Sequence, residues 1–313
     1  MKSNEYNKEY IIKYLDESLK ESDYDFKNIL NVFNKYFENI FNNKFSKYKK
    51  EDNNDIYRIR EYAMLNGGKR LRPFIMFLTT YCINKKNIKK IENYLLSIEL
   101  IHTYSLIHDD LPCMDNDKIR RGKPSVWYKY GEDMGVLAGD SLLTDAFLVL
   151  LDDYVNIKSI KALTYAAGSK KLINGQIIDT KNTYKKNFSE KEILDMYMNK
   201  TGALFASAFE VAGRISELDE KKIKKLYDIG MLLGICFQIQ DDLLEVLPNN
   251  KINKPKDSDK KNKKNTYVIK AGVEKSIHVI NELKLYIYKY LSYVLKDNKK
   301  YKLFIDFVDY MIK

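Results

Sequence analysis

The chain has 313 residues and a formal net charge of +11, and 45% of its residues are hydrophobic, which is enough for a large core. Charged residues make up 31%, an ordinary share for a soluble protein. Only five prolines and thirteen glycines interrupt the chain, which argues against a fold of many short strands and favours long helices.

Signals for export or membrane insertion are weak. Residues 1–10 are too charged for a signal peptide, and no apolar run approaches the roughly 20 residues needed to span a bilayer. The cysteines Cys82, Cys113 and Cys236 have no metal-ligand spacing and are expected to be reduced thiols. We therefore expect a soluble, cytoplasmic protein without a transmembrane segment.

Helical periodicity runs through nearly the whole chain, without convincing alternation of strand type. An apolar stripe predicts a helix over residues 28–47. After a polar break, Asn54 or Asp55 would cap the next helix, and Gly67-Gly68 would end it.

Two segments are apolar on nearly every side and predict buried central helices, namely residues 92–108 and Ile229–Leu247. Residues 248–265 are polar and lysine-dense, as is typical of a loop, but the helical pattern resumes at once after them. Internal repeats of fixed period are absent from the sequence. The prediction is a single all-α domain over residues 1–313.

Two acidic clusters, Asp109–Asp115 and Asp241–Glu245, stand out in this basic chain. Adjacent carboxylates repel each other, at a cost that rises as they lose water. A cation between them offsets that repulsion, and Mg²⁺ takes oxygen ligands that it usually shares with phosphate groups. Acidic pairs on a solvated surface are the alternative, which two clusters at the ends of two apolar helices make less plausible.

Helical spacing brings members of each cluster together. Gln238, Asp241 and Glu245 fall at i, i+3 and i+7 and share one face, with Asp242 beside them. His102, Ser105 and Asp109 have the same spacing. Because Pro112 cannot lie within a regular helix, Asp109-Asp110 would occupy the last turn of theirs.

Basic segments complete the pattern. Gly67–Pro73 joins two glycines to three cations, and glycines let backbone amides approach an anion closely. On its own this segment is equally typical of a helix end followed by a basic turn. Arg120-Arg121-Gly122 could merely neutralise the first acidic cluster, and Lys200-Thr201-Gly202 could be a helix surface. Together with the acidic clusters, these segments indicate a metal-bridged polyphosphate site.

The motifs also occur in a recognisable order. They are Gly67–Pro73, Ile101–Asp117, Arg120–Pro124, Leu137–Leu143, Gly175-Gln176, Lys200–Ala203 and Phe237–Asp242, followed by the K-x₄-D-x₄-K-x-T-Y spacing of Lys254, Asp259, Lys264, Thr266 and Tyr267. This order resembles the trans-polyprenyl diphosphate synthases, in their short-chain branch of farnesyl and geranylgeranyl diphosphate synthases. The resemblance covers essentially the whole chain.

The resemblance implies a bundle of long helices around a deep central cavity, usually in a homodimer, with the two acidic motifs facing each other across the cavity mouth. Asp109, Asp115 and Asp241 would be direct Mg²⁺ ligands. Supporting them would be Asp110, Asp242 and Glu245. About three ions per site are implied, with Mn²⁺ as an alternative ion.

The remaining site residues follow from the same resemblance. Arg120, Lys200 and Lys264 would hold the allylic diphosphate. The isopentenyl diphosphate would be held by Lys69, Arg72, His102 and Arg121, and Gly68 would also bind substrate. Lys254 would help to close the lysine loop, and Thr201 and Gln238 would lie near the developing carbocation.

The implied activity is head-to-tail condensation of isopentenyl diphosphate with dimethylallyl or geranyl diphosphate, which gives farnesyl diphosphate. Tyr104, with Ser105 next to it, lies just before the first motif, and Pro112-Cys113 lengthen that motif. Both features resemble bacterial-type farnesyl synthases, in which an aromatic side chain here limits product length. Core packing alone is the alternative reading of Tyr104, and a geranylgeranyl or mixed product stays open.

Three positions depart from the family pattern. Glu245 stands where Asp is usual, Trp127 where His is frequent, and Asp257 where Gly is common. None removes a predicted ligand, so activity is still expected.

Three other functions compete with this one. A class I terpene cyclase would carry an Asn/Ser/Glu metal motif in place of Asp241–Glu245 and would lack a second diphosphate pocket. A catalytically silent partner subunit would have lost its acidic motifs. A nucleic-acid-binding module is suggested by charge alone, without a recognised motif or basic helix, so no nucleic-acid partner is expected.

Overall fold

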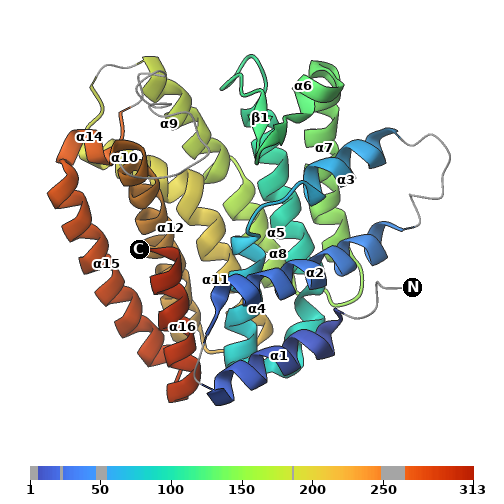
Figure 1. Cartoon of the computed structure of the whole chain (residues 1–313), viewed down its shortest axis with the longest axis vertical. Coiled ribbons are helices and arrows are strands. Elements are labelled where there is room, and N and C mark those ends of the chain that lie inside the picture. The colour runs from blue at the N-terminus through green and yellow to red at the C-terminus, as the bar shows by residue number, and fades with distance from the viewer. Residues whose placement is uncertain (1–5, 22–23, 47–54, 185–186, 248–264) are drawn as a thin grey trace. The chain divides into compact units, whose positions relative to one another are not determined.

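The helices of the computed structural model group into two compact units, Met1–Ile160 and Lys161–Lys313. The structure describes residues 6–21, 24–46, 55–184, 187–247 and 265–313. Over these residues nearly every element is a helix, which confirms the predicted all-α class (Figure 1). The prediction of one domain over the whole chain stays a prediction.

The first unit is built from helices and one short hairpin. In chain order its elements are α1 (Lys8–Glu21), α2 (Phe26–Phe45), α3 (Asp55–Leu65), α4 (Leu71–Asn84), the 3₁₀ turn η2 (Lys85–Asn87), α5 (Ile88–Asp109), the strands β1 (Ile119–Arg120) and β2 (Lys123–Pro124), α6 (Val126–Tyr130), α7 (Glu132–Leu148) and the 3₁₀ turn η3 (Val149–Leu151). Helix α8 (Ile157–Ala167) crosses the boundary between the units.

Helices α2, α4 and α5 form the core of the first unit. Asp25 caps α2 by accepting hydrogen bonds from two backbone N–H groups of its first turn. The apolar stripe of α2 brings the ring of Phe33 onto α4, 5.2 Å from that of Phe74 and 5.3 Å from that of Phe77, measured between ring centres. Helix α5 is buried along nearly its whole length, which confirms the predicted central helix.

The helix boundaries follow the sequence signals closely. Helix α3 begins at Asp55, one of the two predicted caps, and ends two residues before Gly67. Strands were not predicted, and the described residues contain one antiparallel pair of two-residue strands, in which Arg120 lies opposite Lys123.

The stretch Glu132–Leu151, made of α7 and η3, is long and apolar enough to cross a membrane, with a mean hydropathy of 1.7. This finding corrects the expectation that no apolar run approaches that length. The core helix of a water-soluble protein meets the same test, and α7 packs against α5 and α3, where Arg60 pairs with Asp145. Length and composition therefore do not distinguish between these two cases.

The second unit is a bundle of helices. Its elements are α9 (Leu172–Tyr184), α10 (Glu190–Tyr197), the π-helical turn η4 (Met198–Gly202), α11 (Ala203–Ile215), α12 (Glu220–Val246), α14 (Tyr267–Ala271), α15 (Val273–Val294) and α16 (Asn298–Met311).

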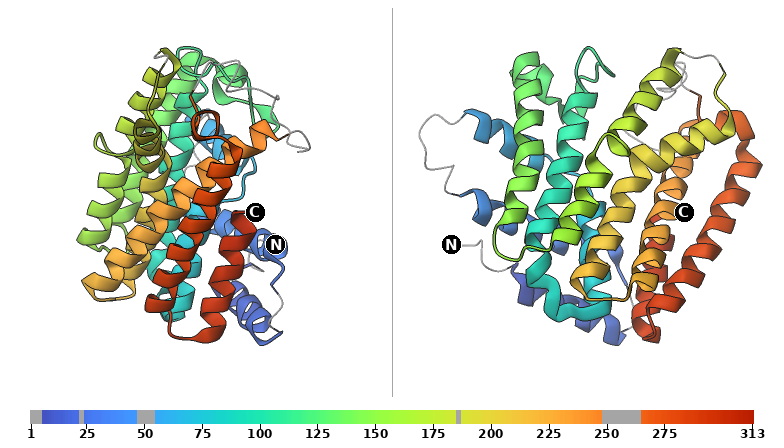
Figure 2. Two further views of the ribbon diagram at one scale, coloured as in Figure 1. Left: turned by 90° about the vertical axis from the view of Figure 1, so that its left-hand side faces the viewer. Right: turned by 180° about the vertical axis from the view of Figure 1, so that it is seen from behind.

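Helix α12 lies beside α11 and α15 in this unit (Figures 1 and 2). Glycines make the contact with α11 and η4 close. A β-carbon on Gly230 would lie 2.4 Å from the backbone of Ala206, and one on Gly234 would lie 2.5 Å from Cα of Gly202. The predicted central helix is confirmed and begins earlier than expected, at Glu220.

Candidate active site

The first acidic cluster forms a tight turn at the end of α5. The helix ends at Asp109, as predicted from Pro112, and the backbone N–H of Asp110 still donates to the carbonyl of Leu106. The chain then folds back, so that the backbone N–H of Asp115 donates to the carbonyl oxygen of Asp109 at 2.9 Å. This turn brings Asp109 and Asp115 together at a half-exposed position.

Asp110 has a different environment from its neighbours. Its side chain is buried and accepts hydrogen bonds from Arg120, from Nε at 2.9 Å and from Nη2. Burial raises the pKa of Asp110 to about 6, while the Arg120 guanidinium opposes the rise. Arg120 also pairs with Asp117 at 3.2 Å. Asp110 thus pairs with an arginine, and its predicted support of a metal stays a prediction.

The β1–β2 hairpin sets the directions of Arg120 and Arg121. Its two turn residues, Arg121 and Gly122, both have positive φ, at 56° and 78°, as a type I′ turn requires. Arg120 on β1 reaches Asp110, while Nη1 of Arg121 donates to the carbonyl oxygen of Gly67 at 2.8 Å. The hairpin therefore connects the acidic turn to the glycine segment between α3 and α4.

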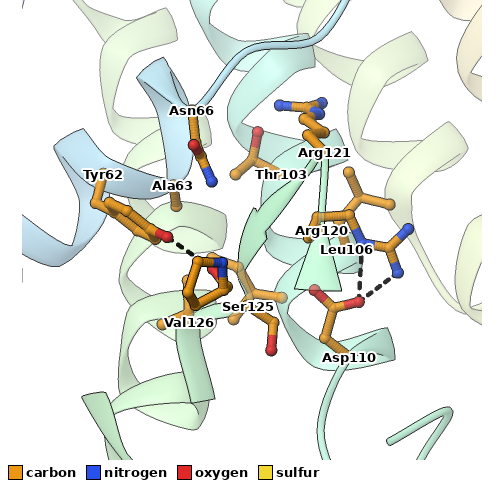
Figure 3. Close-up of a pocket in the computed structure, with 12 residues that line it drawn as sticks. Tyr62, Ala63, Asn66, Thr103, Leu106, Asp110, Arg120, Arg121, Ser125 and Val126 are labelled. Atoms are coloured by element: carbon orange, nitrogen blue, oxygen red, sulfur yellow. Dashed lines mark hydrogen bonds and ion pairs between the residues drawn. The ribbon is translucent and has the colours of Figure 1, made fainter. Parts of the chain in front are cut away.

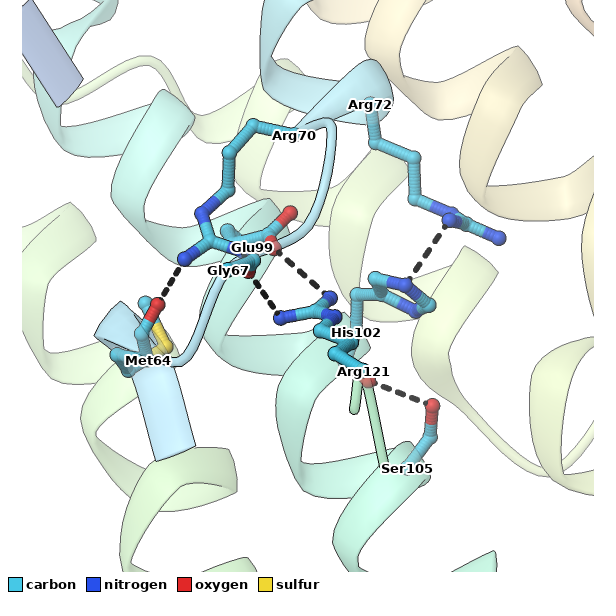
Figure 4. Close-up of polar contacts among 8 residues, drawn as sticks. All are labelled: Met64, Gly67, Arg70, Arg72, Glu99, His102, Ser105 and Arg121. Carbon is cyan, nitrogen blue, oxygen red and sulfur yellow. Dashed lines mark hydrogen bonds and ion pairs between the residues drawn. The ribbon is translucent and has the colours of Figure 1, made fainter. Parts of the chain in front are cut away.

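The segment between α3 and α4, together with the first turn of α4, brings basic side chains close to α5 (Figure 4). Arg72 lies 3.2 Å from Nε2 of His102, and Lys69 is exposed. Burial, followed by the positive charges of Arg72 and Arg121, lowers the pKa of His102 well below its usual value. His102 is therefore a neutral imidazole within a cationic group.

A small cavity of about 30 Å³ lies beside the Asp110–Arg120 pair (Figure 3). Buried polar atoms that line it are Oδ1 of Asn66, Oγ1 of Thr103 and Oγ of Ser125. Its volume suits about two water molecules rather than a prenyl chain. The deep central cavity implied by the family resemblance accordingly stays a prediction.

The residues predicted to set product length lie on different faces of α5. Ser105 donates its hydroxyl to the carbonyl oxygen of His102 at 2.9 Å, on the face that leads to Asp109. Tyr104 is 7% exposed, and its ring packs edge-on against His108, with 5.8 Å between ring centres. Burial raises the pKa of Tyr104 to about 12.

The second acidic cluster lies on α12. Gln238, Asp241 and Glu245 keep the predicted helical spacing and are half-buried. Asp242 is 3% exposed and accepts a hydrogen bond of 2.6 Å from the hydroxyl of Tyr197. Like Asp110, Asp242 thus makes its contact with another side chain of the protein.

Lys200 and Thr201 lie on the π-helical turn η4, a distortion that often marks functional positions. The Nζ of Lys200 lies 2.6 Å from Asp179, and the hydroxyl of Thr201 donates to Oε1 of Gln238 at 3.2 Å. A β-carbon on Gly175 would lie 2.2 Å from the backbone nitrogen of Lys200, so this glycine lets α9 approach the turn. The second unit thus brings Lys200, Thr201 and Gln238 together.

Some predicted positions lie outside the described residues, namely Lys254, Asp257, Asp259 and Lys264.

Of the departures from the family pattern, Trp127 has a clear role, since its indole N–H donates to the carbonyl oxygen of Asp117 at 2.9 Å. It also packs against Gly135, and so joins the acidic turn to α7.

The structure adds polar residues that the sequence reasoning missed. The main ones are Glu99, which contacts two arginines, Asp179, which pairs with Lys200, and Tyr197, which binds Asp242. A signal existed for Glu99, because a carboxylate in the middle of a helix that is apolar on nearly all sides must find a cation. No comparable signal marked Asp179 or Tyr197.

Comparison with known proteins decides the family. The model of the family described as "Polyprenyl synthetase" matches residues 53–290. The chain belongs to the polyprenyl synthetase family. This membership confirms the predicted short-chain trans-prenyl synthase resemblance and the isoprenoid synthase type of fold.

Relatives of this chain include two kinds of synthase. A farnesyl diphosphate synthase of Micrococcus luteus is 35% identical over 282 residues, which are 88% of this chain and 96% of that protein. A geranylgeranyl diphosphate synthase of Cyanophora paradoxa is also 35% identical, over 71% of this chain and 76% of its own length.

A solved structure of a geranyltransferase from Helicobacter pylori, described as complexed with magnesium and isoprenyl diphosphate, has a similar fold. It is 26% identical with a TM-score of 0.70, and the match covers 88% of this chain and 95% of that one.

Proposed function

We propose that this polyprenyl synthetase condenses isopentenyl diphosphate with dimethylallyl or geranyl diphosphate and releases farnesyl diphosphate. The observation that carries the proposal lies along one face of α5, where a carboxylate turn that suits a metal ion follows a cationic group that suits a diphosphate. Carboxylates at Asp109 and Asp115 share a turn, and the cationic group around His102 begins seven residues earlier. Seven helical residues span about 10 Å, a separation that suits two neighbouring diphosphates.

Magnesium fits the carboxylate turn. Hard oxygen ligands at a half-exposed position suit Mg²⁺, and among the described residues no group of three His, Cys, Asp or Glu could hold an ion by itself. We propose that Asp109, Asp115 and Asp241 would hold about three Mg²⁺ ions, with Mn²⁺ as an alternative ion. When bound, Mg²⁺ neutralises charge on the departing diphosphate.

The protein's own groups would then carry the remaining steps. Breaking of the allylic C–O bond leaves negative charge on the diphosphate, which Arg120, Lys200 and Lys264 would stabilise. Positive charge on the allylic carbon would face the oxygens of Thr201 and Gln238. The double bond of isopentenyl diphosphate, held by Lys69, Arg72 and Arg121, would attack that carbon, and a proton would leave to the diphosphate.

Product length and assembly belong to the same proposal. Tyr104 supports a C15 product, while a C20 or mixed product is the second candidate, favoured by the 35% identical geranylgeranyl synthase.

We propose a homodimer in the cytoplasm. The apolar side chains of Val136, Leu137 and Leu148 on α7, which are 43–52% exposed, support a protein interface there.

The test is incubation of purified protein with radiolabelled isopentenyl diphosphate and each allylic starter, followed by chromatography of the products. The expected result is labelled C15 alcohol after dephosphorylation, only when Mg²⁺ is present. Incorporation equal to that of a chelated blank would refute the activity. Light scattering of the same sample measures the mass of the assembly.

A further inference from the structure

Glu99 is a buried carboxylate at the centre of the basic group on α5. It is 1% exposed, and its Oε1 lies 3.3 Å from Nη1 of Arg70 and 3.7 Å from Nη2 of Arg121. Lying three residues before His102, it shares the helix face of that imidazole. One carboxylate oxygen thus joins two guanidiniums that come from different parts of the chain (Figure 4).

The guanidinium of Arg70 contacts only groups of the protein itself among the described residues. It donates to the carbonyl oxygens of Met64, at the end of α3, and Gly67, in addition to its contact with Glu99. Its backbone has a φ of 49°, a conformation that non-glycine residues seldom adopt. Since Arg70 is only 5% exposed, its side chain closes the turn between α3 and α4 instead of facing a ligand.

Arg121 is held by the same two acceptors. It donates to the carbonyl oxygen of Gly67 at 2.8 Å and contacts Glu99, while its remaining N–H groups stay available to another anion. Gly68 makes this arrangement possible, because a β-carbon there would lie 2.6 Å from Cζ of Arg121 and 2.7 Å from Nη1 of Arg70.

Electrostatics makes a compensating carboxylate necessary at this position. Arg70, Arg72, Arg120 and Arg121 all act on His102 as positive charges, so the group repels itself when no substrate is bound. Burial of Arg70 and Arg121 adds a desolvation cost, which a shared carboxylate offsets. The substrate diphosphate cannot perform this task before it arrives.

We propose that Glu99 and Arg70 are positioning residues that hold Arg121 and the Gly67–Arg72 segment in their binding arrangement before isopentenyl diphosphate enters. This inference rests on the proposed function, because it assigns the basic group to that substrate. It predicts a selective defect: the KM for isopentenyl diphosphate rises, while the KM for the allylic diphosphate changes little.

The direct variant is Glu99→Gln, which keeps the shape of the side chain and removes its charge. Loss of a charge-assisted contact to Arg121 should raise the KM for isopentenyl diphosphate by about tenfold or more. The variant leaves the buried Arg70 and the half-buried Arg121 without their shared carboxylate, so a loss of stability accompanies the change in binding. For that reason the decisive variant is Glu99→Gln combined with Arg70→Gln, which removes one charge of each sign.

The double variant should fold, as judged by circular dichroism and thermal unfolding, and still show the raised KM for isopentenyl diphosphate. A matched control is Glu92→Gln on the same helix, where the carboxylate binds Tyr36 and Lys89 at a distance from the basic group. This control should lower stability without changing either KM.

Two outcomes separate the claims. If the wild-type protein performs no condensation, the proposed function fails. If the wild type is active and the folded double variant binds isopentenyl diphosphate as tightly as the wild type does, the positioning role fails while the function stands. Equal rises in both KM values would also overturn the positioning role, because they would mean general disruption of the site.

Discussion

The imidazole of His108 occupies the space that a β-carbon on residue 139 would need. Such a carbon on Gly139 would lie 2.0 Å from Nε2 of His108, and that nitrogen lies 3.1 Å from the carbonyl oxygen of Val136. The contact joins α5 to α7 one residue before Asp109. Because Gly139 has no side chain, His108 can pack against α7, and this contact holds the last turn of α5 and the acidic turn in place.

Gly139→Ala should displace this ring and destabilise the protein by about 1–3 kcal/mol, as overpacking of a core contact typically does. Turnover should fall as well, because the shift reaches Asp109. Combining the change with His108→Ala frees the space again, so the double variant should recover part of the lost stability. Urea unfolding of the four proteins measures this coupling, and purely additive effects would show that ring and glycine are independent.

Asp109→Ala and Asp241→Ala should each lower turnover by roughly 10²–10³, as expected for loss of one group that stabilises charge in the transition state. Steady-state kinetics over a range of Mg²⁺ concentrations would record the loss. Asp306→Ala serves as the control, because that carboxylate pairs with Lys302 on α16 and is not a predicted site residue. Near-normal turnover of either site variant would contradict its metal role.

Tyr104→Ala should lengthen the products beyond C15 if the tyrosine limits the growing chain. Its burial against His108 means that the change also opens space in a packed core, so some loss of stability is expected. Chromatography of the dephosphorylated products measures the outcome. A companion variant, Ser105→Phe, adds bulk on the face that leads to Asp109 and should shorten the products. An unchanged product distribution in both variants would locate the limit elsewhere.

Acid should destabilise the protein partly through His102. Since burial and the surrounding arginines hold its pKa well below 6.5 in the folded state, only the unfolded chain binds a proton there as the pH falls below about 6.5. The free energy of unfolding should therefore decrease from pH 7 to pH 5. In His102→Gln this part of the decrease should disappear, and unfolding curves at several pH values measure the difference. Parallel pH profiles of the two proteins would contradict the assignment.

The helices and the acidic clusters were predictable because their signals are local. Apolar periodicity marked α5 and α12, and Pro112 marked the end of α5 at Asp109. The spacing of Gln238, Asp241 and Glu245 followed from helix geometry alone.

Other parts of the site depend on contacts between distant segments, which a single sequence does not reveal. The pairing of Arg120 with Asp110 depends on the β1–β2 hairpin. Strands of two residues are too short to give a recognisable alternating pattern, so this hairpin could not be predicted. The hydrogen bond from Tyr197 to Asp242 joins residues that are 45 positions apart in the sequence. Likewise, Gly175 looked like part of a motif, but its close approach to Lys200 is visible only in three dimensions.

The β1–β2 hairpin limits which insertions and deletions this chain can accept. Exposed hairpin tips usually tolerate insertions and deletions, and this one is exposed at Gly122 and Lys123. Here, however, a shift of one residue would exchange the faces of β1 and turn Arg120 away from Asp110 while moving Arg121 away from Gly67. Substitutions of the exposed Lys123 should therefore be accepted where changes in the length of this loop are not, because that length fixes where Arg120 meets Asp110 and where Arg121 meets Gly67.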